Sequence, residues 1–85
     1  MMKLEEATNI IREEYPNYKL ISVVDYDNYF VFNIVPPDYN VEQYGAWFGG
    51  LVAVDKTFKL TLHFIPLEHN ADAYAKATQN NIKYF

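Results

Sequence analysis

Two separate segments of this chain, residues 28–35 and 58–65, alternate apolar and other side chains with the period of a β-strand. The apolar sets are Phe30, Phe32 and Ile34 in the first segment, and Phe58, Leu60, Leu62 and Phe64 in the second. Successive side chains of a strand point to opposite faces, so each set predicts one buried face of a sheet. We therefore expect core positions at Phe30, Phe32, Leu60 and Leu62.

Each alternating segment follows another strand candidate across a polar turn. Asp, Asn and Thr favour such turns, and prolines end the strands that follow them. The predicted pairs are residues 19–25 with 28–35, joined through Asp25-Tyr26-Asp27-Asn28, and residues 50–55 with 58–65, joined through Asp55-Lys56-Thr57. The sequence thus predicts two β-hairpins, which make a mostly antiparallel sheet of four strands.

A helix is predicted near each end of the chain. Apolar residues at helical spacing favour a helix over residues 4–15, which Pro16 ends. Asn70 is suited to cap a second helix over residues 71–81, where alanines raise helix propensity. We expect a single α+β domain over residues 1–85. One sheet face would pack on the first helix, and the second helix would lie against the sheet or its edge.

Composition excludes several classes of protein. Hydrophobic residues make up 51% and aromatic residues 18%, which excludes intrinsic disorder, and the absence of cysteine excludes disulfides and thiolate sites. Lys and Arg number 7 against 11 Asp and Glu, and they are scattered singly, so nucleic acid is not an expected partner. With no long apolar run and no secretion signal, we expect no membrane association and a cytoplasmic location.

Candidate metal sites are weak in this sequence. The two histidines, His63 and His69, are separated by Pro66, and although Glu68 precedes His69, nothing in the sequence brings the three together. Residues 25–28 (DYDN) begin like a calcium loop, but Phe30 stands where that loop needs glycine. We expect a polar hairpin turn there, and neither a metal nor a cofactor in this protein.

Catalytic patterns are equally weak. The only serine, Ser22, lies within a strand candidate, without a nucleophile elbow. The carboxylate pairs Glu5-Glu6 and Glu13-Glu14 are neighbours on an exposed helix surface, and Gly49-Gly50 lacks the lysine of a phosphate-binding loop. We expect no catalytic residues and do not expect an enzyme.

The longest irregular segment, residues 38–49 (DYNVEQYGAWFG), concentrates aromatic side chains. Tyrosine and tryptophan dominate the hot spots of protein interfaces. The predicted binding residues are Tyr39, Tyr44, Trp47 and Phe48. The segment is either a contact surface or a lid over an open sheet face. As a contact surface it binds another protein or forms one wall of a pocket for a small ligand or peptide.

The order of these elements resembles a PepSY-like domain, in which a helix ends near proline and a strand ends in a V-D-x-x-T-G-type turn. The matching pieces are Glu6-Ala7, Tyr15-Pro16, residues 20–24 and 29–34, and Val54-Asp55-Lys56-Thr57. The chain is also similar to small uncharacterised proteins of Gram-positive bacteria and their prophages, which share a VPxDY stretch (residues 35–39) and an AVDK strand end (residues 53–56).

This resemblance implies a small non-catalytic protein-binding or regulatory module, prophage-encoded, whose partner is another protein. The chain itself would be a monomer or a weak homodimer. The alternative is a small-ligand or peptide-binding domain that uses residues 38–49. One departure matters, because Phe58 follows Thr57 where the family pattern has glycine. A bulky residue does not easily adopt positive φ, so the turn must differ or shift.

Overall fold

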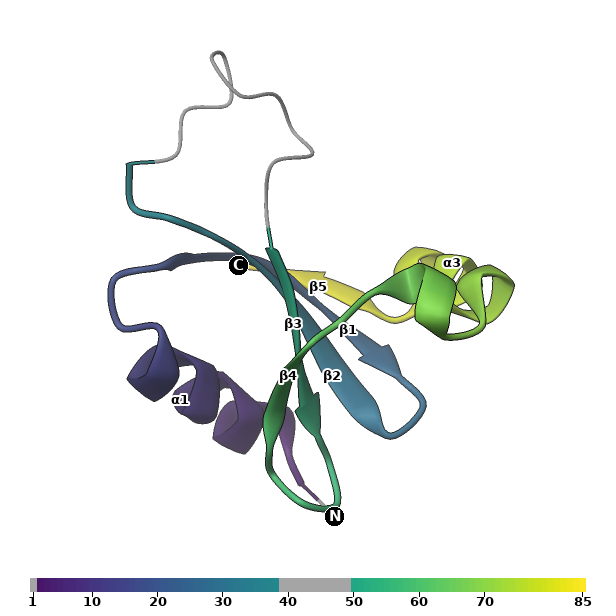
Figure 1. The fold of residues 1–85 in the computed structure, drawn as a ribbon, viewed down its shortest axis with the longest axis horizontal. Helices are drawn as coiled ribbons and strands as arrows, with labels where there is room; N and C mark the ends of the chain where they lie inside the picture. The colour runs from purple at the N-terminus through teal and green to yellow at the C-terminus, as the bar shows by residue number, and fades with distance from the viewer. Residues whose placement is uncertain (1, 39–49) are drawn as a thin grey trace.

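A computed structural model describes residues 2–38 and 50–85. The elements follow one another as α1 (Leu4–Glu14), β1 (Lys19–Tyr26), β2 (Tyr29–Val35), β3 (Gly50–Asp55), β4 (Thr61–His63), the 3₁₀ helix η1 (Pro66–Glu68), α3 (Ala71–Asn80) and β5 (Ile82–Tyr84). Figure 1 shows α1 and α3 on opposite sides of one sheet. The predicted α+β class and the predicted helices near each end are confirmed.

In the described part of the chain the sheet has five strands in the order β4-β3-β2-β1-β5, and every neighbouring pair is antiparallel. Strands β1 to β4 succeed one another across the sheet, and the chain then passes through η1 and α3 to the opposite edge. There Ile82 pairs with Val24 and Tyr84 pairs with Ser22. The predicted count of four strands is therefore wrong by one, because three residues are too few to show an alternation in the sequence.

The α1 side of the sheet carries the larger core. Its buried members are Met2, Ala7, Ile11, Val23, Phe30, Phe32, Ile34, Val52 and Val54. The expected burial of Phe30 and Phe32 is confirmed. The apolar stripe of α1 supplies Ala7 and Ile11 to this core. A helix of this length would be marginal in water by itself, and its packing on the sheet stabilises it.

A second core lies between the other sheet face and α3. It contains Val24, Val31, Ala53, Phe64 and Ala77. In β2, Val31 therefore belongs to a buried face as well, although it alternates with Phe30 and Phe32. The reason is that α3 covers the sheet face that the sequence pattern left as the wetter one.

The start of the predicted fourth strand is wrong. β4 begins only at Thr61, and the preceding residues form the turn from β3. In that turn Lys59 has a φ of 59° and donates its backbone N–H to the Asp55 carbonyl at 2.8 Å. The expected shift of the turn is thus found, since the left-handed residue is Lys59 and not Phe58.

This turn takes two side chains of the predicted apolar face out of the sheet. Phe58 is 71% exposed and Leu60 is 64% exposed, so the assignment of Leu60 to the core is wrong. Leu62 is half-buried, and it packs on the α3 side together with Phe64. The side chains at positions 58, 60, 62 and 64 alternate in the sequence, but only Leu62 lies in β4, and Phe64 follows it with its N–H donating to the Leu51 carbonyl.

Tyr74, on the α3 side of the sheet, is expected to make the stability of the protein depend on pH. Its ring contacts Tyr26 and Phe64 with centroid distances of 5.5 and 5.1 Å, and burial raises the pKa of Tyr74 above 10.0. Because the pKa of Tyr74 is raised in the folded state, Tyr74 ionises in the unfolded chain at a lower pH than in the folded one. The contribution of Tyr74 to the free energy of unfolding is therefore fully present below the ordinary tyrosine pKa and is lost as pH rises above it. We expect urea melts between pH 9 and 11 to lose less stability for Tyr74→Phe than for the wild type, and equal losses would contradict this assignment.

Candidate functional site

The binding residues predicted from the sequence, Tyr39, Tyr44, Trp47 and Phe48, lie outside the described residues. Their role as a contact surface or core lid stays a prediction.

The two histidines face opposite sides of the sheet. His63 is exposed on β4 and pairs with Val52, whose side chain belongs to the α1-side core. The His69 ring stacks on Phe64 in the α3-side core, with centroids 4.5 Å apart and an interplanar angle of 13°. His69 thus has a packing role, and the structure does not bring it together with His63.

The described residues offer neither a metal site nor a membrane-spanning helix. No group of three or more His, Cys, Asp or Glu side chains is placed to hold a metal ion in that part of the chain. Neither α1 nor α3 has the length and apolarity needed to cross a bilayer.

The densest polar cluster joins the β1–β2 turn to the β3–β4 turn. Its centre is the Asp55 carboxylate, in which Oδ1 accepts hydrogen bonds from the Thr57 and Phe58 backbone N–H groups at 2.7 and 3.0 Å. The same oxygen accepts from Asn28 Nδ2 at 3.0 Å. Asp55 therefore holds its own turn in shape and ties that turn to the neighbouring hairpin.

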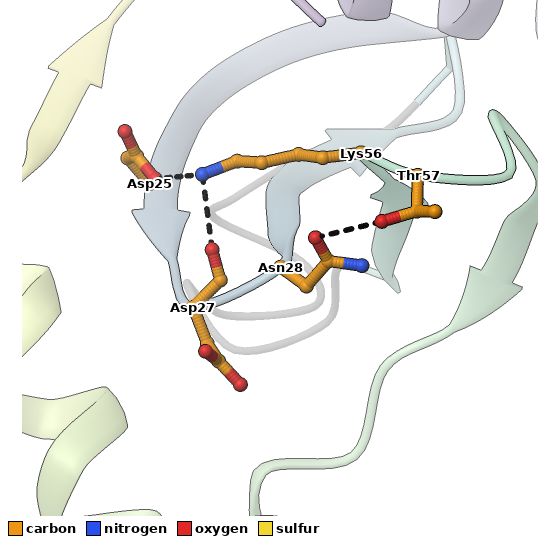
Figure 2. Close-up of polar contacts among 5 residues, drawn as sticks. All are labelled: Asp25, Asp27, Asn28, Lys56 and Thr57. Atoms are coloured by element: carbon orange, nitrogen blue, oxygen red, sulfur yellow. Dashed lines mark hydrogen bonds and ion pairs between the residues drawn. The ribbon is translucent and has the colours of Figure 1, made fainter. Parts of the chain in front are cut away.

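Lys56 extends this cluster across the sheet, as Figure 2 shows. Its Nζ forms an ion pair with Asp25 Oδ1 and donates to the Asp27 carbonyl at 3.0 Å. The side chain is only 9% exposed, and Nζ lies 4.6 Å from the centre of the Phe30 ring. The aliphatic stem thus packs against the sheet while the charge is compensated at its tip.

The cluster explains the residues that resembled the start of a calcium loop. Asp27 adopts a φ of 50°, which aspartate tolerates better than most residues, and Asp27 and Asn28 form the two-residue connection of the hairpin. The expected polar hairpin turn is confirmed. The contact between Asp25 and Lys56 could not be predicted, since 31 residues separate them and neither belongs to a recognisable motif.

A shallow groove runs between α1 and the start of β4. Its volume is about 320 Å³, and it is lined by Ile10, Glu13, Glu14, Lys59, Leu60 and Thr61. The Lys59 Nζ forms an ion pair with Glu6 Oε1 at 3.2 Å, and Glu6 does not line the groove. The groove therefore combines apolar contacts with two carboxylates that can attract a cation.

β4 forms one edge of the sheet, and its outer side carries unpaired backbone groups among the described residues. The Leu60 carbonyl accepts from the Asp55 N–H, and the Phe64 N–H donates to the Leu51 carbonyl, so these two residues turn their backbone toward β3. Backbone groups alternate along an antiparallel strand. The N–H and C=O groups of Thr61 and His63 consequently point away from the sheet.

Large apolar side chains are exposed at both ends of this edge. Phe58 and Leu60 precede β4, while Ile65 and Leu67 follow it, and Leu67 is 87% exposed. Sequence reasoning missed this surface because it placed Phe58 and Leu60 on the apolar face of a predicted strand and assigned Leu60 to the core. The available signal was the missing glycine after Thr57, since a shifted turn removes both residues from the strand.

The chain matches no family model, no curated protein and no solved structure. The PepSY-like resemblance stays a prediction.

Proposed function

We propose that this chain is a small non-catalytic protein-binding module that takes up an extended segment of another protein along the outer side of β4. The observation that carries the proposal is the β4 edge, which none of the described strands covers, between exposed apolar side chains. A segment that adds to such an edge gains backbone hydrogen bonds, while pockets beside the edge select its side chains.

The groove beside β4 favours the binding of a segment in which an apolar residue lies close to a Lys or Arg. Ile10 and Leu60 offer the groove an apolar surface, and Glu13 and Glu14 offer it negative charge. A second copy of the chain is a poorer occupant, because each copy has a net charge of -4 and pairing would bring the same carboxylates together.

Replacement of one outward backbone donor tests the proposal. We expect peptides selected on the folded chain from a random-peptide display library to lose about ten-fold or more in affinity for His63→Pro. Proline removes the outward N–H and puts its ring in the path of the added strand. The ladder to β3 is kept, since edge strands tolerate proline whose N–H would face solvent. Fluorescence anisotropy measures the affinity, and a thermal melt verifies that His63→Pro is folded.

A matched pair of charge variants tests the choice of occupant. Glu14→Gln should weaken the selected peptides about three-fold, whereas Glu5→Gln, an exposed position of α1 outside the groove lining, should leave their affinity unchanged. Equal affinity for the wild type and a folded His63→Pro would overturn the proposal. A wild-type dimer in sedimentation that His63→Pro dissociates would assign the edge to a second copy instead.

We also propose a cytoplasmic location. The absence of cysteine supports it, because small exported domains commonly depend on disulfides. The prophage setting is supported by the family resemblance alone. Recovery of the tagged chain in the exported fraction of its host cells would contradict the location.

A further inference from the structure

A hollow of about 380 Å³ lies on the α1 side of the sheet, between the start of α1 and the β1–β5 edge. It exists because α1 packs over β3, so the helix covers that end of the sheet face only with its first residues. The hollow is separate from the groove beside β4, and none of its lining residues belongs to that groove.

Strand register determines which side chains enter this hollow. Val23 pairs with Lys83, and Asp25 pairs with Phe30, so these four side chains share the α1 side of the sheet. Val23 and Phe30 form an apolar floor together with Met2 and Leu4. Lysines and an asparagine stand around that floor, so the hollow has an apolar base and a polar rim.

The rim is basic although the protein is acidic. Among the described residues that line the hollow, Lys3, Lys56 and Lys83 are basic and Asp25 is the only carboxylate, so these side chains together carry two net positive charges. The Lys56 ammonium already donates to Asp25 and to Asp27. Lys3 and Lys83 are thus the groups available for direct contact with a ligand.

We propose that this hollow binds a small amphiphilic anion, a carboxylate that carries a short hydrocarbon tail. The tail lies on the apolar floor, in which Leu4 is half-buried while Val23 and Phe30 are buried, and it displaces water from the apolar surface that stays accessible there. The carboxylate lies at the rim, where Lys83 and Lys3 donate charge-assisted hydrogen bonds. This site is independent of the β4 edge, so either proposal can fail without the other.

Four probes separate the tail from the charge. We expect octanoate to shift the backbone amide signals of Val23, Lys83 and Leu4 in the NMR spectrum of the isotope-labelled full chain. Octanol lacks the charge, acetate lacks the tail, and octylamine reverses the charge, so each of them should bind about ten-fold more weakly or not at all. The octanoate affinity should also fall as salt is raised, since the rim lysines contact solvent.

Charge removal with a matched control locates the anion contact. The double variant Lys3→Gln/Lys83→Gln should weaken octanoate binding about ten-fold, and Lys76→Gln, an exposed position on α3, should leave it unchanged. Neither lysine of the double variant is buried, and the spectrum itself reports that the variant is folded.

Three results would overturn the proposal. The first is the absence of shifts around Val23 and Lys83 at octanoate concentrations of tens of millimolar. The second is equal binding of octanol or octylamine, which would make the hollow apolar only. The third is unchanged octanoate affinity in the double lysine variant.

Discussion

Replacement of Phe32 by alanine is expected to reduce the free energy of unfolding by about 3–5 kcal/mol. Phe32 is 0% exposed at the centre of the α1-side core, and the terminal Phe85 ring stacks on it with centroids 6.2 Å apart. Removal of the ring therefore leaves a cavity that α1 and the sheet cannot fill without moving. Small domains are stabilised by only about 5–15 kcal/mol in total, so urea melts should show a much lower midpoint.

Phe58→Ala is the matched control, because it makes the same chemical change at a side chain that is 71% exposed. We expect its free energy of unfolding to stay within about 0.5 kcal/mol of the wild type. A loss of less than about 1 kcal/mol for Phe32→Ala would mean that the faces of β2 are assigned backwards. A large loss for Phe58→Ala would contradict its exposure.

Asp55→Ala is expected to reduce the free energy of unfolding by about 2–3 kcal/mol. The substitution removes one oxygen that accepts hydrogen bonds from Thr57, Phe58 and Asn28. The Thr57 and Phe58 N–H groups then lose their partner, and the two hairpin turns lose one of their links. Lys56 is placed by the same turn, so its ion pair with Asp25 should weaken as well.

Asp55→Asn separates the turn geometry from the charge. Asparagine keeps a side-chain oxygen that can accept the same backbone hydrogen bonds, so we expect a loss of less than about 1 kcal/mol in urea melts. Equal losses for Asp55→Ala and Asp55→Asn would show that the negative charge, and not the turn hydrogen bonds, gives Asp55 its effect.

The surface along the β4 edge shows why its residues could not be predicted from the sequence. Leu60 and Phe64 belong to one alternating run in the sequence, yet Leu60 is exposed and Phe64 is buried. The difference arises because the turn that contains Lys59 delays the start of the strand until after Leu60. The hollow above Val23 was equally hidden, because Lys3, Lys56 and Lys83 are scattered along the chain. Each of these sites depends on contacts between segments that are distant in sequence, which local patterns do not encode.

The sequence by itself determined the local elements of this protein. The stripe of α1 predicted the helix that ends before Pro16, the turn at Asp27 and Asn28 predicted the first hairpin, and Asn70 predicted its cap, which accepts the Ala73 N–H at 3.0 Å. These features depend on neighbouring residues, whose steric and hydrogen-bonding preferences act within a few positions of the chain.

The tertiary structure decided how many strands form and which sheet faces are buried. β5 forms because residues 82–84 reach the edge of β1, and Val31 is buried because Phe64 and the α3 residue Ala77 belong to the core on the second face. β4 begins at Thr61 because the turn from β3 extends through Lys59. Periodicity in a strand states which side chains share a face, but the elements that pack against that face determine whether it is covered.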